Sequence, residues 1–206
     1  MRARAILGGL LDLVAPPACA ACDAPLAPGG EGLCAPCGAL VERADGAPRA
    51  AFLYGGPLAD AVRRFKYGGR SELAPVLARM ARPAVLELAG RVDVVVSVPL
   101  HPRRERARGY DQTALLARAW ARALAVPCRA RALGRVRDTP PQASLDVGAR
   151  DANVRAAFRV LASLPPRVLL VDDVRTTGAT LAACGEALLA AGVVEVHPFV
   201  LARVEG

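Results

Sequence analysis

The stretch that decides the fold is Val168-Leu169-Leu170-Val171-Asp172-Asp173-Val174-Arg175-Thr176-Thr177-Gly178-Ala179-Thr180, near the carboxyl end of the 206-residue chain. Its four leading apolar residues predict a strand buried on both faces, and the apolar spacing from Thr180 onward predicts a helix. Gly178 permits close backbone approach, while the N–H groups of a helix start and the threonine hydroxyls form a nest for an anion. The stretch therefore predicts a strand–loop–helix unit that binds a monoester phosphate.

Asp172 and Asp173 follow the apolar run directly. Adjacent residues of a strand point to opposite faces, so this pair is poorly arranged to chelate one ion unless the strand has already ended. Hydrogen bonds to the vicinal hydroxyls of a sugar suit the pair better, and an acidic pair that caps the next helix is the structural alternative. In the context of the whole loop, we expect a phosphorylated ribose here, most simply phosphoribosyl pyrophosphate.

Strands and helices alternate around this unit. Apolar runs predict strands over 51–54, 92–98, 168–171 and 193–201. Helical patterns cover 58–66, 72–88, 113–124 and 180–191, with Pro83 kinking or splitting the second. This alternation predicts an α/β fold in which helices flank a parallel sheet and ligands bind at the carboxyl ends of its strands. The irregular segment 135–157 is expected to be a lid.

A second phosphate site is expected where the strand over 92–98 ends, at Pro99, Leu100, His101 and Arg104. A strand that delivers backbone amides and guanidinium groups to the same sheet edge suits a pyrophosphate, because arginine contacts phosphate oxygens in bidentate fashion. On the residues alone, a solvated basic turn explains the segment equally well.

Four cysteines near the amino end form the pairs Cys19-x-x-Cys22 and Cys34-x-x-Cys37. Two such knuckles supply four thiolates that close a tetrahedron, which favours a structural zinc ion. A pair of disulfides is the alternative, but nothing else indicates an oxidising compartment. We therefore expect an N-terminal helix and a small zinc-ribbon-like module over residues 1–48, and the α/β domain over residues 49–206.

The composition favours a basic globular protein. Hydrophobic residues make up 53% of the chain, which excludes a disordered protein, and 27 Lys and Arg against 19 Asp and Glu give a net charge of +8. That charge suits a partner that carries phosphates, although the arginine and alanine bias can also arise from background coding composition. Charges punctuate every apolar stretch, so we expect a cytoplasmic protein without a membrane span.

Residues 168–180 match throughout the signature of type I phosphoribosyltransferases, which the loop resembles in its four apolar residues, two acids and Thr-rich glycine loop. The resemblance implies that Asp172 and Asp173 hold the ribose 2′- and 3′-hydroxyls and that Mg²⁺ rides on the pyrophosphate. Thr176 stands where some members carry an aspartate that accepts a proton, so the general base is unassigned. The residues implied to hold the 5′-phosphate are Thr176, Thr177, Gly178, Ala179 and Thr180.

Nearly the full chain also resembles the ComF family of competence-associated proteins, which includes GntX-like members. The matching segments are residues 98–112, the run Phe65-Lys66-Tyr67-Gly68-Gly69-Arg70, residues 137–142, residues 153–158 and the cysteine module. The resemblance implies a link to DNA uptake, with the competence machinery as a partner.

Two functions follow from these observations. The first is a phosphoribosyltransferase, a glycosyltransferase in which the lid closes over a catalytic site at Asp172 and Asp173 while Arg135 and Arg137 stabilise the departing pyrophosphate. The second is a non-catalytic protein that binds single-stranded nucleic acid and keeps the pocket for sensing. A metabolite-binding scaffold with neither activity is the third alternative.

Overall fold

The computed structural model describes residues 17–27, 29–30, 32–46, 49–135 and 157–205. Within these ranges, four strands form a parallel sheet in the order β1-β6-β5-β2, and the register pairs Val96 with Leu170 and Val171 with Phe199. The expected α/β class with a parallel sheet is therefore confirmed. The strands of the sheet are β1 (Arg49–Leu53), β2 (Val94–Ser97), β5 (Arg167–Arg175) and β6 (Glu195–Arg203).

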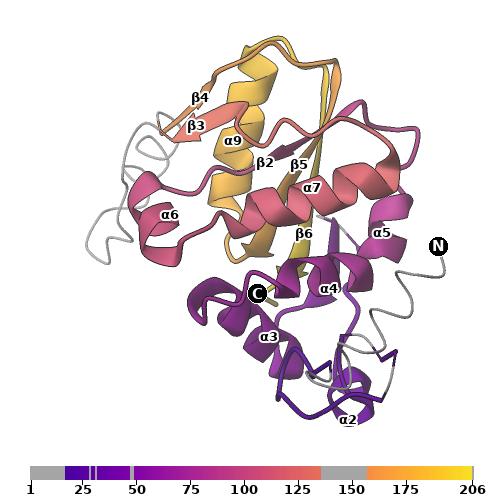
Figure 1. Ribbon diagram of the computed structural model, residues 1–206. Coiled ribbons are helices and arrows are strands. Elements are labelled where there is room, and N and C mark those ends of the chain that lie inside the picture. Colours follow the sequence, from indigo (N-terminus) through magenta and orange to yellow (C-terminus); the bar gives the residue numbers. More distant parts are fainter. Residues whose placement is uncertain (1–16, 28, 31, 47–48, 136–156, 206) are drawn as a thin grey trace, which may run out of the picture.

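Helices cover both faces of this sheet (Figure 1). One face packs against α3 (Gly56–Tyr67), α4 (Leu73–Met80), α5 (Arg82–Leu86) and α7 (Gln112–Leu124), and the other against α9 (Ala179–Ala190). Side chains of β5 alternate between the two cores: Leu169 and Val171 pack on the α7 side, Val168 and Leu170 on the α9 side. Burial on both faces explains the continuous apolar runs of the central strands.

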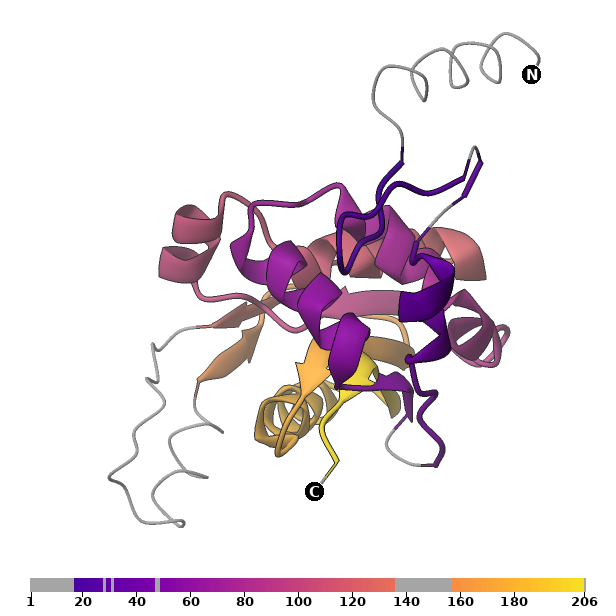
Figure 2. The same cartoon turned by 90° about the horizontal axis from the view of Figure 1, so that it is seen from below.

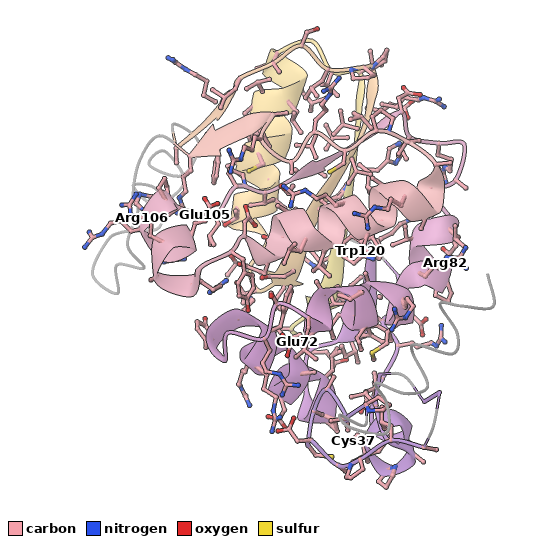
Figure 3. The ribbon with its side chains drawn as sticks, in the orientation of Figure 1. Cys37, Glu72, Arg82, Glu105, Arg106 and Trp120 are labelled. Atoms are coloured by element: carbon pink, nitrogen blue, oxygen red, sulfur yellow. The ribbon has the colours of Figure 1, made fainter. Side chains whose placement is uncertain are left out.

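Trp120 on α7 is the largest fully buried side chain. It lies between α7 and α4 (Figure 3), where its Nε1–H donates to the carbonyl of Ala78 at 3.2 Å. Its ring meets Phe199 of β6 edge-on, with 5.0 Å between the ring centroids. The indole thus satisfies its polar group while joining α4, α7 and the sheet in one core.

The helix expected over 72–88 is split, as its proline suggests. α4 ends at Met80, and α5 begins at Arg82 with Pro83 in its first turn, where a missing N–H is tolerated. The end expected for β5 at Val171 is wrong, because the strand continues to Arg175. β6 is equally long and supplies ladder partners throughout, so both aspartates lie inside the strand.

Two short helices and a hairpin complete the described chain: α2 (Ala35–Ala39), α6 (Pro102–Arg108) and the antiparallel pair of β3 (Leu133–Arg135) with β4 (Phe158–Val160). The hairpin pairs Arg135 with Phe158 at the two ends of the expected lid. Residues 136–156, which include Arg137, lie outside the described residues, as does the helix expected in residues 1–16. Among the described helices, none has both the length and the apolar character needed to cross a membrane.

Candidate functional site

The carboxyl ends of β2 and β5 bring the two expected phosphate segments to one edge of the sheet. The two strands are parallel neighbours, and the N–H of Val98 donates to the carbonyl of Val171 at 2.8 Å. Pro99 and the residues after it therefore start beside Asp172. Figure 2, which views the molecule from below, shows α3 beside the ends of β5 and β6.

The loop after β5 is shaped by Gly178. This residue has φ of +85° and is the N-cap residue of α9, and as a glycine it supplies no side-chain cap. The backbone conformation favours glycine, and a Cβ at this position would lie 2.8 Å from Nε of Arg175, so the arginine side chain would have to move. The N–H of Ala179 donates to Oγ1 of Thr177 at 3.4 Å. The start of α9 thus offers backbone donors and a positive helix end to an anion.

The segment after β2 is a turn that leads into α6. His101 is the N-cap residue of α6, and its Nδ1 accepts from the N–H of Arg103 at 3.3 Å. Arg104 is exposed, while Leu100 is half-buried and its backbone hydrogen-bonds the carboxylate of Asp111. His101 therefore has a structural task as a helix cap, and its expected contact with pyrophosphate stays a prediction.

Asp173 points to the α3 and α7 side of β5 and is only 4% exposed. Its Oδ1 lies 2.8 Å from Nζ of Lys66 and accepts from the N–H of Val174 at 2.6 Å. Its Oδ2 accepts from Nε2 of Gln112 at 2.9 Å. With three donors around a buried carboxylate, this aspartate is an anchor between β5, α3 and α7.

Asp172 is half-buried, and its Oδ1 accepts from the N–H of Asp173 at 2.8 Å and from Oγ1 of Thr113 at 3.4 Å. Burial, followed by the negative charge of Asp173, raises the pKa of Asp172 to about 8. Its carboxyl group is therefore mostly protonated at neutral pH, and it can donate as well as accept a hydrogen bond. The two aspartates thus differ in burial, charge and partners.

Sequence reasoning missed the roles of Lys66, Gln112 and Thr113. Lys66 is the only lysine of the chain, and that isolation was the available signal. Gln112 and Thr113 open α7 directly after its N-cap Asp111, which accepts from the N–H of Ala114 at 2.9 Å. Gln112 is 5% exposed, and its Oε1 has no hydrogen-bond partner among the described residues. This oxygen is a spare acceptor beside Asp173.

The four N-terminal cysteines converge on one point. The Sγ atoms of Cys19, Cys22, Cys34 and Cys37 all lie within 4.8 Å of one another, and those of Cys22 and Cys34 are 3.7 Å apart. Sulfurs placed tetrahedrally ~2.3 Å from a metal ion are about 3.8 Å apart, whereas a disulfide bond is about 2.05 Å long. All the cysteines are free thiols. The cluster therefore fits a tetrahedral metal ion.

The thiols of this cluster differ in acidity. Burial opposes ionisation of Cys19, but backbone hydrogen bonds from Cys34, Cys22 and Ala21 lower its pKa to about 6. Hydrogen bonding to Cys34, together with burial, raises the pKa of Cys37 to about 12. Four neighbouring thiols cannot all ionise without a cation among them, so metal binding at this site would release protons.

These observations define an α/β protein in which helices flank a parallel sheet and an N-terminal module carries four clustered cysteines. The chain belongs to the family of DNA utilization protein YhgH and competence protein F. The resemblance to the ComF family is thereby confirmed.

The relatives match over most of the chain. Identity is 35% over 156 residues with DNA utilization protein YhgH of Escherichia coli (strain K12), covering 73% of this chain and 69% of the relative. The protein of the same name from Salmonella typhimurium is 37% identical over 159 residues, with the same coverage. Competence protein F of Haemophilus influenzae is 34% identical over 157 residues, covering 71% of this chain and 68% of the relative.

No protein-family model matches the chain. One similar solved structure is the allosteric regulatory enzyme of purine biosynthesis, with a TM-score of 0.41 and 24% identity over 65% of this chain. Another is glutamine phosphoribosyl pyrophosphate amidotransferase from B. subtilis complexed with ADP and GMP, with a TM-score of 0.42 and 24% identity over 69% of this chain. This chain spans 25% and 27% of their respective lengths.

Proposed function

We propose that the edge formed by the ends of β2 and β5 binds phosphoribosyl pyrophosphate. The observation that carries this proposal is the loop at Gly178, where a residue of positive φ starts α9 at the end of the strand that carries Asp172. Backbone donors at the start of α9 suit the 5′-phosphate, and the turn from Pro99 to Arg104 suits the pyrophosphate.

Asp172 supports the ribose part of the proposal. A carboxyl group with a pKa of about 8 can donate to one sugar hydroxyl and accept from another, and its neighbour Asp173 already has three donors. We therefore assign the direct hydroxyl contact to Asp172 and the support of the strand to Asp173. Mg²⁺ would accompany the pyrophosphate, whose charge it neutralises.

A phosphoribosyl transfer is the reaction that such a site suits. An acceptor forms a bond to C1′ of the ribose while the bond from C1′ to the pyrophosphate oxygen breaks, and the pyrophosphate leaves with both bonding electrons. Arg135 lies at the base of the expected lid, where it stacks on the ring of Phe158 at 5.5 Å. Thr176 is exposed and offers no general base, so the acceptor must lose its proton to another group.

Calorimetric titration with phosphoribosyl pyrophosphate and Mg²⁺ tests the ligand. Saturable binding by the wild-type chain, weaker binding of ribose 5-phosphate and loss of binding in Thr177→Arg would support the proposal. Absence of heat at millimolar ligand, with the protein folded, would overturn it. Pyrophosphate release with a panel of bases, amines and oligonucleotides then separates a transferase from a sensor.

The second candidate function is the binding of single-stranded DNA. It is favoured by the names of the relatives, which are a DNA utilization protein and a competence protein, and by the net charge of +8. Arginines that contact phosphates release counterions, so affinity should fall linearly with salt on a logarithmic scale. Fluorescence anisotropy of a labelled oligonucleotide measures that slope, and no retention at low salt would exclude this function. In both cases the proposed role is in DNA uptake, together with the competence machinery.

For the cysteine cluster we propose a structural zinc ion. Zinc is bound tetrahedrally by four thiolates in closed sites, and the sulfur spacing at Cys22 and Cys34 suits that geometry. A reducing compartment such as the cytoplasm keeps thiols available as ligands, which agrees with the free thiols of the chain. Metal analysis of the purified protein tests this assignment.

A further inference from the structure

Asp23 connects the first cysteine pair to α3. It directly follows Cys22, and its φ of +59° is in the left-handed region that few residues other than glycine adopt. Its carboxylate forms ion pairs with Arg64 and with Arg70, the latter at 2.8 Å. Hydrogen bonds from these two guanidinium groups lower the pKa of Asp23, so the group is ionised at neutral pH. A strained turn thus presents one carboxylate to two arginines of a distant segment.

The two arginines flank Lys66 in the sequence. Arg64 lies in the last turn of α3 and Arg70 lies just beyond that helix. Lys66, between them, points to the sheet, where its Nζ is 2.8 Å from Oδ1 of Asp173. One short segment therefore contacts the cysteine module with two side chains and the strand-end site with a third.

The same segment is fixed from two further directions. Tyr110 donates its hydroxyl to the carbonyl of Phe65 and stacks on the Phe65 ring, with 5.8 Å between the ring centroids. Cys19 is fully buried in the hydrophobic core that also contains Phe65 and Leu77. Figure 3 shows Cys37 at the end of the molecule that is remote from the β3–β4 hairpin. The module and the site are thus separate in space but joined by one continuous set of contacts.

We propose that the cysteine module positions the strand-end site through two residues, Asp23 and Lys66. The module holds the turn at Asp23, Asp23 holds the end of α3 through Arg64 and Arg70, and the end of α3 holds Lys66 against Asp173. The inference rests on the proposed function in that the positioned site is the one assigned to phosphoribosyl pyrophosphate. Asp23 and Lys66 are positioning residues, since neither is assigned a contact with that ligand.

Asp173 transmits the effect to the end of β5. It accepts from the N–H of Val174, and its own N–H donates to Oδ1 of Asp172. A shift of the Asp173 carboxylate therefore moves the backbone that carries Asp172 and leads into the Gly178 loop. Hydrogen exchange of the Val174 amide reports on this contact directly, without any ligand.

The test compares Asp23→Ala with Asp60→Ala in the full chain. Asp60 is a matched control, because it forms an exposed ion pair with Arg63 on the same helix at 2.9 Å and, among the described residues, has no hydrogen bond or ion pair to the cysteine module. We expect Asp23→Ala to speed exchange of the Val174 amide about three- to fivefold and to weaken binding of Mg²⁺ phosphoribosyl pyrophosphate by a similar factor, the size of an exposed ion pair. Asp60→Ala should change neither quantity.

Substitutions of Lys66 test the second contact, between α3 and Asp173. Lys66→Met should accelerate exchange of the Val174 amide roughly tenfold or more, because the buried Asp173 loses its cation. Lys66→Arg should restore most of the protection by keeping a charge near Asp173. If Lys66→Met fails to fold, the double variant Lys66→Met with Asp173→Asn removes both charges, and it should fold with the Val174 amide still poorly protected.

Chelation completes a thermodynamic cycle. Removal of the metal with a chelator should speed Val174 exchange in the wild-type chain and add little in Asp23→Ala, because both changes break the same connection. Metal content is measured for each variant. If Asp23→Ala loses its metal, Arg64→Met combined with Arg70→Met removes the same contacts from the α3 side.

The outcomes separate this inference from the proposed function. If the wild-type chain does not bind phosphoribosyl pyrophosphate, the proposed function fails, and Val174 exchange alone decides the inference. Equal exchange in Asp23→Ala and Asp60→Ala would overturn the inference even where the ligand binds. An equal effect of chelation in the wild-type chain and in Asp23→Ala would overturn it as well.

Discussion

The two adjacent aspartates of β5 differ in burial and in the charge of their hydrogen-bond partners. On the α3 and α7 face, Asp173 is buried and is held by Lys66, Gln112 and the N–H of Val174. Asp172 is half-buried and has only neutral donors, the N–H of Asp173 and the hydroxyl of Thr113 in the first turn of α7. A cation near one carboxylate favours its charge, and burial without a direct cation disfavours the charge of the other.

This difference shows how two adjacent acidic residues of one strand can acquire different partners. If the strand had ended at Val171, both carboxylates could have turned to one ligand or ion. Because β5 continues to Arg175, the pair keeps the alternation of a strand, and each side chain has different partners. Asp173 joins β5 to α3 and α7, whereas Asp172 keeps part of its surface exposed.

The largest effect is expected on the anchored face. Asp173→Asn should lower the free energy of unfolding at pH 7 by about 3 kcal/mol, because Lys66 is left without a counter-charge in a mostly buried place. Urea denaturation measures the loss. Asp60→Asn, which breaks an exposed pair, should cost less than about 0.5 kcal/mol. Equal losses in the two variants would contradict the assignment of Asp173 as an anchor.

Replacement of Asp172 by asparagine should instead raise the free energy of unfolding. The pKa of Asp172, about 8 in the folded chain, exceeds its unfolded value of about 3.9, so the folded state binds more protons between these two pH values. The protonated Asp172 makes its full contribution to the free energy of unfolding below about pH 4, and this contribution is lost as pH rises toward 8. Asp172→Asn removes the titration and should raise the free energy of unfolding at pH 8 by at least about 1 kcal/mol, with no gain at pH 4. Urea denaturation across this pH range checks the sign, and a loss at pH 8 would refute it.

A smaller effect distinguishes the two ends of α9. Gly178 and Gly192 both have positive φ, but only Gly178 has a side chain, Arg175, against the position of a Cβ. Alanine at either position should cost about 1 kcal/mol of stability through backbone strain. Only Gly178→Ala should also weaken binding of phosphoribosyl pyrophosphate, measured by calorimetry. Equal binding by the two variants would show that the Gly178 loop is not part of the binding site.

The smallest effect concerns the hydroxyl of Thr113, which lies 3.4 Å from Oδ1 of Asp172 and helps to lower the pKa of that carboxyl group. Thr113→Val should raise the pKa of Asp172 further, because the charged form loses a donor. Carboxyl carbon chemical shifts, followed by NMR during a pH titration, measure the change. A lower pKa in the variant would show that the hydroxyl does not act on Asp172.

Local patterns in the sequence were sufficient for the four strands of the sheet, its longer helices and the cysteine cluster, but not for α2, α6 or the β3–β4 hairpin. The apolar runs, the proline at position 83 and the two Cys-x-x-Cys pairs each act over a few residues, so their consequences could be predicted without knowing the fold. The end of β5 could not be predicted in this way. Strand length depends on a partner, and β6 lies beyond the loop and α9 in the chain.

The partners of the two aspartates were also beyond sequence reasoning. Gln112 precedes Asp173 by 61 residues, and Lys66 precedes it by 107. Nothing local distinguishes Asp172 from Asp173, and only the packing of α3 and α7 on one face makes one of them an anchor. Asp23 is a similar case, because its arginines lie in a different segment, 41 and 47 residues away.

The sequence by itself determined the strand–loop–helix unit over residues 168–180, because this segment carries its own strand, turn and helix start. Backbone conformation at Gly178 and the spacing of four thiols are local properties, and local properties can be read from a linear pattern. Only the tertiary structure decided which aspartate is buried, where its charge is balanced and how the cysteine module reaches α3. The physical reason is that burial and charge pairing depend on distances between segments that the chain brings together only when it folds.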